Sequence, residues 1–178
     1  KVLLLVCEGR TFIAGADISE FGKPMQDPGL PSVVDQYENC DKPIVAAIHG
    51  TALGGGLETA LGCHYRVALS SAKVGLPEVK LGLLPGAGGT QRLPRLTGAQ
   101  KALEMITSGE FVGAKDALAL GIVDAVEDGN DIKAVGLAYA QNIADEGKPV
   151  RRVRDLTDKL EADKGSEVFE QFRAGLQK

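Results

Sequence analysis

Three consecutive glycines, Gly54 to Gly56, stand between an apolar run at residues 44–48 and a helical pattern that begins at residue 57. Glycine loses more backbone entropy on folding than alanine does, so a fixed glycine cluster is costly unless something must approach the main chain closely. The following helix would present unpaired N–H groups and the positive end of its dipole at this turn. The turn therefore suits an anion, or a carbonyl oxygen that becomes one during a reaction; a tight structural turn is the alternative explanation.

The order of apolar and turn-forming residues predicts an α/β fold in which helices cover a sheet. Two apolar runs, residues 2–7 and 44–48, lack polar alternation, which is typical of strands buried on both faces of a sheet. The expected strands are residues 2–7, 44–48, 65–69 and 74–76, and the expected helices are residues 32–39, 57–62, 90–107, 114–120 and 132–144. Residues 9–31, 50–56 and 81–89 are expected to form loops, the first of them with a helical turn.

Composition and charge exclude several classes of protein. The 178 residues are 44% hydrophobic and 25% charged, as in an ordinary globular protein, and the net charge is −4 without a basic stripe, so no nucleic-acid partner is expected. The apolar runs are far shorter than the roughly 18 residues that cross a bilayer, so no membrane-spanning segment is expected. The three cysteines, Cys7, Cys40 and Cys63, have no close pair and are expected to be reduced thiols.

The chain divides into two regions by composition. Residues 1–126 carry the strand and helix patterns of a core, whereas residues 127–178 are expected to form a helical and charged C-terminal connector. Of the 17 residues 148–164, 10 are charged with mixed signs, which is typical of a solvated segment rather than a binding patch. No element precedes the apolar run at residues 2–7 to supply a neighbouring strand, so we expect the core to lack an N-terminal part.

Two glutamates are candidates for acid–base chemistry. Glu58 follows the glycine turn in the first turn of the expected helix, where a carboxylate can also be a simple dipole partner. Glu78 lies in a largely apolar stretch. Apolar surroundings raise the pKa of a carboxyl group, and a second carboxylate nearby raises one of the pair further. A pair of this kind would supply one acid and one base near neutral pH.

Other common sites are not indicated. The sequence has no phosphate-binding loop that ends in Gly-Lys-Ser/Thr, no complete dinucleotide fingerprint and no serine in a nucleophile elbow. His49 and His64 have no Cys or His partner at the spacing of metal ligands, so no metal site is expected. His49 ends an apolar run and is expected to be a structural, hydrogen-bonded histidine.

Four ordered stretches, residues 12–18, 46–58, 76–78 and 82–93, resemble the enoyl-CoA hydratase/isomerase (crotonase) family. The resemblance covers residues 1–126, and residues 164–172 are similar to the region that follows the hydratase domain in multifunctional fatty-acid oxidation proteins. It implies a crotonase-like spiral of β-β-α units without its first strand and helix. It also implies an acyl-CoA thioester substrate and no metal or redox cofactor, coenzyme A being part of the substrate.

The same resemblance implies roles for individual residues. The N–H groups of Ala16 and Gly55 would form an oxyanion hole for the thioester oxygen, and Glu58 and Glu78 would be the two catalytic glutamates. Gly86 would help to place the attacking water through its backbone. The segment with Ala14, Asp17 and Ile18 would accept the adenine end of coenzyme A.

The expected activity is that of an enoyl-CoA hydratase in fatty-acid β-oxidation, which adds water across the conjugated double bond of a 2-enoyl-CoA. The alternatives are a 3-enoyl-CoA to 2-enoyl-CoA isomerase of the same family and a non-catalytic acyl-CoA-binding homologue. Family members commonly form homotrimers, and multifunctional relatives carry a 3-hydroxyacyl-CoA dehydrogenase domain in tandem. The expected location is the bacterial cytoplasm, or the peroxisome or mitochondrial matrix of a eukaryote.

Overall fold

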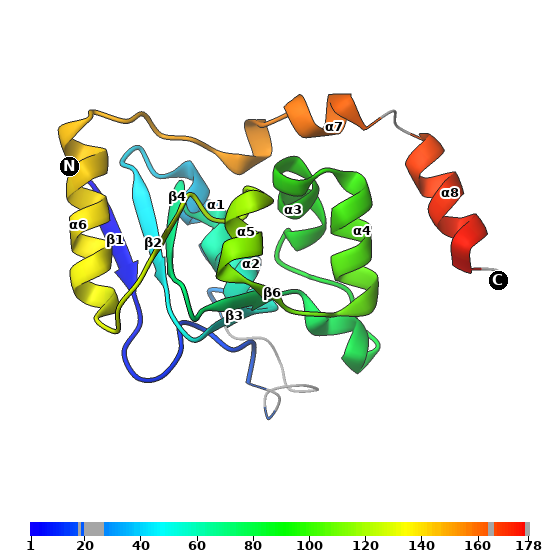
Figure 1. Ribbon diagram of the computed structural model, residues 1–178, viewed down its shortest axis with the longest axis horizontal. Coiled ribbons are helices and arrows are strands. Elements are labelled where there is room, and N and C mark those ends of the chain that lie inside the picture. The colour runs from blue at the N-terminus through cyan, green and yellow to red at the C-terminus, as the bar shows by residue number, and fades with distance from the viewer. Residues whose placement is uncertain (18, 20–26, 164–165, 177–178) are drawn as a thin grey trace.

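The computed structural model describes residues 1–17, 19, 27–163 and 166–176. Its main sheet contains β1 (Leu3–Val6), β2 (Ile44–Ile48), β4 (Tyr65–Leu69) and β7 (Ala125–Glu127), which are parallel and lie in the order β1-β2-β4-β7 (Figure 1). A smaller sheet contains β3 (Thr51–Leu53), β5 (Lys73–Gly75) and β6 (Val112–Gly113), in the order β3-β5-β6.

The two sheets are linked by a repeating β-β-α unit. In one unit, β2 of the main sheet leads to β3 of the smaller sheet and then to helix α2 (Gly55–Gly62). In the next unit, β4 leads to β5, to the 3₁₀ helix η2 (Pro77–Leu81) and to helix α3 (Gly89–Thr97). The predicted α/β spiral is therefore confirmed.

Helices cover the main sheet on both faces. Helix α6 (Ile132–Asp145) packs on β1, β2 and β4 from one side (Figure 1). Alternate residues of β2 point to opposite faces: Val45 and Ala47 contribute to the core under α6, whereas Ala46 and Ile48 belong to the larger core around α2 and α3. The remaining helices are α1 (Leu30–Asn39), α4 (Ala99–Ser108), α5 (Ala114–Ala119), η3 (Val153–Asp155), α7 (Asp158–Ala162) and α8 (Ser166–Leu176).

The structure corrects several sequence-based expectations. The strand predicted at residues 2–7 is β1, but it lies at the edge of the described sheet and is only partly buried, with Leu3 46% exposed. The expected helix at residues 90–107 is two helices, because Gly98 adopts a φ of +84° between α3 and α4. The expected loop at residues 50–56 contains β3 and the start of α2, and the loop expected at residues 81–89 is preceded by η2. The short strands β6 and β7 were not predicted.

The segment of residues 150–156, here called the strap, runs from α6 across the molecule to α7 (Figure 1). Val153 is buried, and Arg152 Nε donates a hydrogen bond to the carbonyl oxygen of Glu38 at 3.0 Å. The expectation of a solvated connector is therefore wrong for the strap, because its arginine side chains bind Glu38 and Asp124 in the body of the fold. The domain boundary after residue 126 falls within β7 and stays a prediction.

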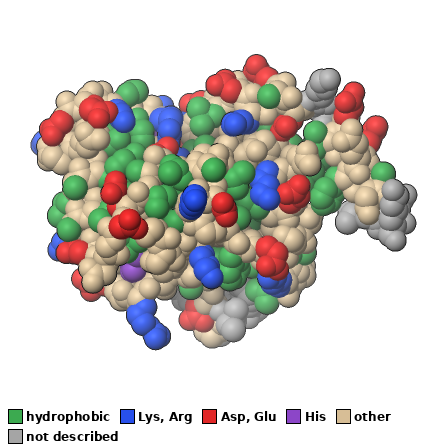
Figure 2. Space-filling view, viewed as in Figure 1, with side chains coloured by type: hydrophobic (Ala, Val, Ile, Leu, Met, Phe, Trp, Pro, Cys, Tyr) green, Lys and Arg blue, Asp and Glu red, His purple; other side chains and the backbone are tan. Residues whose placement is uncertain are grey.

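The surface carries charges of both signs. On the face in Figure 2, basic and acidic side chains are interspersed, without a continuous basic stripe. Among the described residues, every helix is too short or too polar to cross a membrane.

Candidate active site

A cavity of about 410 Å³ lies where the start of α2 meets η2 and the loop that follows it. The segment of residues 14–16 and the first residues of α1 complete its wall. The lining residues are mostly apolar or glycine, and two of them are glutamates: Ala14, Gly15, Ala16, Leu30, Pro31, Gly54, Gly55, Glu58, Pro77, Glu78, Leu81, Leu83, Leu84, Gly86 and Ala87. The glycine turn and both candidate glutamates thus border one cavity.

Glu58 is fixed by main-chain hydrogen bonds. It lies in the first turn of α2 and is 2% exposed. Its Oε1 atom accepts hydrogen bonds from the N–H groups of Ala87 at 2.7 Å and Gly89 at 2.8 Å. A Cβ atom at position 89 would lie 3.0 Å from that oxygen, so the close approach favours glycine there. Glu58 therefore has a defined orientation at the cavity wall.

Glu78 is held differently. It lies on η2, and within the described part of the chain its Oε2 atom is buried without a hydrogen-bond partner. Burial raises the pKa of the Glu78 carboxyl group above its ordinary value, and the charge of Glu58 raises this pKa further against an opposing backbone hydrogen bond. A raised pKa favours the protonated form of Glu78, which is the form that can donate a proton.

The glycine turn brings two chain segments together at the cavity. Ile13 N–H donates to Thr51 O at 3.2 Å, and Leu53 N–H donates to Ile13 O at 3.0 Å, so the segment before Ala14 lies along β3. A Cβ atom at Gly56 would lie 2.1 Å from Ile13 O, which no side chain tolerates. The absence of a side chain at Gly56 is therefore what allows α2 to begin against the segment that contains Ala16.

Most of the predicted site residues meet at the cavity. Ala14, Ala16, Gly55, Glu58, Glu78 and Gly86 all line it. Asp17 does not line it; its carboxylate is exposed and accepts a hydrogen bond from Ser19 N–H at 2.9 Å, which lowers the pKa of Asp17. Ile18 lies outside the described residues, and the coenzyme A contacts of this segment stay a prediction.

Sequence reasoning missed the groups that support Glu58. Ala87 and Gly89 were assigned only to a loop, and Arg92 was given no role of its own. Arg92 is buried and donates from Nη1 to the carbonyl oxygen of Ala87 at 3.0 Å. The available signal was the Gly88-Gly89 pair directly before a helix, a place where consecutive N–H groups are free to bind an anion.

Both histidines have structural partners. His64 is buried and its Nδ1 atom accepts a hydrogen bond from Ile44 N–H at 2.9 Å. His49 Nε2 lies 3.2 Å from the carbonyl oxygen of Gly9, in agreement with the structural role expected for it. Across residues 1–17, 19, 27–163 and 166–176, no cluster of three His, Cys, Asp or Glu residues is placed to hold a metal ion.

Comparison with known proteins gives the family of the chain. The family model described as enoyl-CoA hydratase/isomerase matches residues 1–177. The chain is 52% identical over 157 residues to a peroxisomal bifunctional enzyme of Danio rerio, covering 86% of the chain and 21% of that protein. It is 49% identical over 153 residues to a probable enoyl-CoA hydratase of Bacillus subtilis, covering 79% of the chain and 59% of the relative.

Solved structures show the same fold. The crystal structure of an enoyl-CoA hydratase from Bacillus anthracis superposes with a TM-score of 0.74 at 38% identity, covering 81% of this chain and 58% of that one. The chain therefore spans about a fifth of the bifunctional enzyme and somewhat over half of the two hydratases. From its sequence, its spiral of β-β-α units and these similarities, the chain belongs to the enoyl-CoA hydratase/isomerase family and has the crotonase fold.

Proposed function

We propose that this chain carries the active site of an enoyl-CoA hydratase, which adds water to a 2-enoyl-CoA to give a 3-hydroxyacyl-CoA in fatty-acid β-oxidation. The observation that carries the proposal is that Glu58 and Glu78 line one cavity together with Gly55 and Ala16. Relatives named as enoyl-CoA hydratase and peroxisomal bifunctional enzyme support it.

The proposed oxyanion hole consists of the N–H groups of Ala16 and Gly55. Addition of water to a conjugated thioester moves negative charge onto the thioester oxygen, and fixed N–H donors stabilise that charge. Loss of one such donor in other enzymes costs about 100- to 1000-fold in rate. Gly55 is the first residue of α2, where N–H groups lack intrahelical partners and the helix dipole is positive.

The two glutamates would divide the proton transfers. Glu58, as carboxylate, accepts a proton from water while the water oxygen bonds to the β-carbon. Protonated Glu78 donates its proton to the α-carbon, so that H and OH are both added and the carbonyl is restored. A proton then returns from Glu58 to Glu78 through the next water, which resets the pair. General acid–base catalysis of this kind contributes about 100- to 10,000-fold.

The rest of the cavity suits an acyl chain. Leu81, Leu83 and Leu84 line it and are substantially exposed, which is unusual for large apolar side chains unless they meet a ligand or a partner. Gly86 would help to place the water through its backbone. We propose no metal or redox cofactor, because the proton transfers need only carboxylates and main-chain N–H groups.

The proposal extends to partners and location. Similarity to bifunctional and multifunctional relatives supports a 3-hydroxyacyl-CoA dehydrogenase domain in tandem, with a homotrimer as the alternative assembly. Relatives from a bacterium and from peroxisomes support a bacterial cytoplasmic or a peroxisomal location.

The test follows the loss of the conjugated enoyl absorbance of a short 2-enoyl-CoA. Wild-type chain should hydrate it, and Glu58→Gln should lose about 100-fold or more. Glu161→Gln, the same change at an exposed residue of α7, should hydrate at the wild-type rate. If the wild-type chain isomerises a 3-enoyl-CoA without hydrating the 2-enoyl-CoA, the isomerase replaces the hydratase; binding without turnover of either substrate would indicate the non-catalytic homologue.

A further inference from the structure

The loop of residues 86–89 holds Glu58 with two peptide N–H groups. The N–H groups of Ala87 and Gly89 donate to Glu58 Oε1 at 2.7 and 2.8 Å. Of the two carbonyls between these N–H groups, that of Ala87 accepts a hydrogen bond from Arg92 Nη1 at 3.0 Å, and that of Gly88 accepts the N–H groups of Gln91 and Arg92 at 3.0 and 2.9 Å. The hydrogen bond from Arg92 therefore restrains the backbone between the two donors.

Arg92 also packs directly against the loop. A Cβ atom at Gly88 would lie 2.0 Å from Arg92 Nη1, so the guanidinium occupies the space that a side chain would need. Gly88 has a φ of +97°, a conformation that glycine adopts without strain. The loop is thus enclosed between Glu58 on one side and the guanidinium of Arg92 on the other.

The guanidinium is itself fixed by a buried carboxylate. Arg92 donates to Glu38 Oε2 from Nη2 at 2.7 Å and from Nε at 3.3 Å, and to Asp35 Oδ1 at 3.1 Å. Glu38 is 1% exposed on α1. Burial alone would lower the pKa of Arg92, but its hydrogen bonds and charge pairing with Glu38 and Asp35 outweigh burial, and the pKa is raised. Arg92 is therefore held as a cation.

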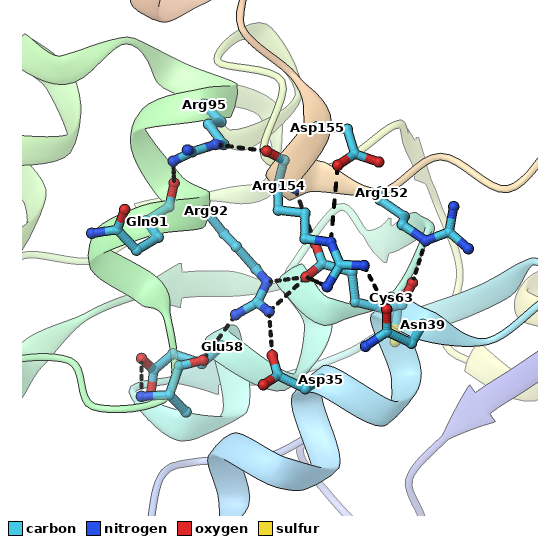
Figure 3. Close-up of polar contacts among 12 residues, drawn as sticks. Asp35, Asn39, Glu58, Cys63, Gln91, Arg92, Arg95, Arg152, Arg154 and Asp155 are labelled. Atoms are coloured by element: carbon cyan, nitrogen blue, oxygen red, sulfur yellow. Dashed lines mark hydrogen bonds and ion pairs between the residues drawn. The ribbon is translucent and has the colours of Figure 1, made fainter.

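Glu38 has partners beyond Arg92, and two of them come from the strap. Its Oε1 atom accepts a hydrogen bond from Arg154 N–H at 3.0 Å, and its main-chain carbonyl accepts one from Arg152 Nε at 3.0 Å (Figure 3). A buried ion pair of this kind gains little net stability, because removal of both charges from water offsets their attraction. Arg92 uses its remaining N–H group to bind Ala87, a residue that lines the cavity. Stability alone does not account for this arrangement.

We propose that Arg92 is a positioning residue for Glu58. Its hydrogen bond to the Ala87 carbonyl orients the N–H groups of Ala87 and Gly89, which in turn fix the Glu58 carboxylate. Arg92 itself is held by Glu38, which the strap holds in place. This inference rests on the proposed function for its kinetic consequence, but its structural part does not. It assigns the strap, far along the chain from both glutamates, a role in the geometry of the site.

The first test is hydrogen exchange at the amides of Ala87 and Gly89, measured by NMR on the whole chain. Arg92→Met removes the hydrogen bond to the Ala87 carbonyl and should accelerate exchange at both amides by about 10-fold or more. Arg173→Met is the matched control, the same change at an exposed residue of α8. It should leave both amides within about twofold of wild type.

The second test is kinetic and distinguishes positioning from general support of the fold. Arg92→Met should lower kcat for hydration about 10- to 100-fold with a much smaller change in KM. In a Glu58→Gln background the same substitution should lower kcat less than about threefold further, because Arg92 acts through Glu58. The proposal would be overturned if the kcat loss of the Arg92→Met, Glu58→Gln double variant equalled the product of the two single losses. Unchanged hydrogen exchange at both amides in Arg92→Met would also overturn it.

A third variant covers a failure to fold. Arg92→Met leaves Glu38 buried without its cation, which is destabilising, whereas Glu38→Gln combined with Arg92→Met leaves a neutral pair that still offers an acceptor to Arg154 N–H. The double variant should regain stability and keep fast exchange at the two amides; recovery of slow exchange would contradict a positioning role. If the wild-type chain hydrates no enoyl-CoA, the proposed function fails, while the exchange measurements still decide the role of Arg92.

Discussion

Gly89 N–H donates a hydrogen bond to Glu58 Oε1 at 2.8 Å and so connects the start of α3 to the first turn of α2. This bond distinguishes the two glutamates of the cavity. Glu58 is a hydrogen-bonded carboxylate in a fixed orientation, whereas Glu78 is partly buried and has a raised pKa. The difference in surroundings supports the proposed assignment of base and acid.

Glu78→Gln should lower hydration activity about 100- to 10,000-fold, because the amide N–H of glutamine is far too weak an acid to protonate the α-carbon. The substitution should also change the pH dependence of stability. Because the folded pKa of Glu78 is raised above 4.5, its stabilising contribution is present at low pH and is lost as the pH rises through the folded value. The unfolding free energy of the variant minus that of wild type, measured in urea, should therefore be larger at pH 8 than at pH 4. Equal differences at both pH values would contradict the raised pKa.

Gly56→Ala should destabilise the fold and disrupt the cavity. The added methyl would lie 2.1 Å from Ile13 O, so either α2 or the segment that leads to Ala16 must move. Overpacking of this kind typically costs about 1–3 kcal/mol, measurable as a lower midpoint in urea unfolding. Gly113→Ala is the control, since a methyl there meets no atom of the described residues within 4 Å. A Gly56→Ala variant as stable and active as Gly113→Ala would show that the close approach is not required.

Stability should fall in mild acid because of His64. Burial lowers the pKa of His64, and its Nδ1 atom accepts the Ile44 N–H and so must be unprotonated. A lowered folded pKa means that the unfolded chain binds the proton more readily, so this contribution to stability declines as the pH falls below about 6.5. The urea midpoint of wild type should drop between pH 7.5 and 5.5 by more than that of His64→Asn, whose Oδ1 can accept the same hydrogen bond. An equal drop would exclude His64 as the source.

Cys63 should resist alkylation in the native protein. Burial raises the pKa of its thiol to about 12, so at pH 8 almost none is present as the reactive thiolate. Native chain treated with iodoacetamide should show no label at Cys63 by mass spectrometry, and chain unfolded in urea should show complete labelling. Labelling of Cys63 at the same rate in both states would contradict its burial.

The parts of the fold that sequence reasoning identified are those set by local patterns. The apolar run at Ile44–Ile48 specifies a buried strand, which occurs as expected. The expected strand at Tyr65–Leu69 is also present. Elements without a local signal were missed: β7 has only three residues and is defined by its pairing with β4.

The same distinction applies to the site. Glu58 and Glu78 were recognisable because each is an acid beside glycine or apolar residues, and the structure places both at one cavity. Arg92 and Glu38 were not, because each lies on an amphipathic helix where a charge is ordinarily exposed to solvent. Their burial results from a pairing across 54 positions that only the tertiary structure creates.

The central claim is that Glu58 and Glu78 act as a coupled pair across one cavity, and the most direct measurement is the pKa of Glu78 with and without the charge at position 58. ¹³C-labelled glutamate would be titrated by NMR in the wild-type chain and in Glu58→Gln, whose amide oxygen can still accept the N–H groups of Ala87 and Gly89. Removal of a nearby negative charge should lower the pKa of Glu78. An identical pKa for Glu78 in both proteins would contradict the claim.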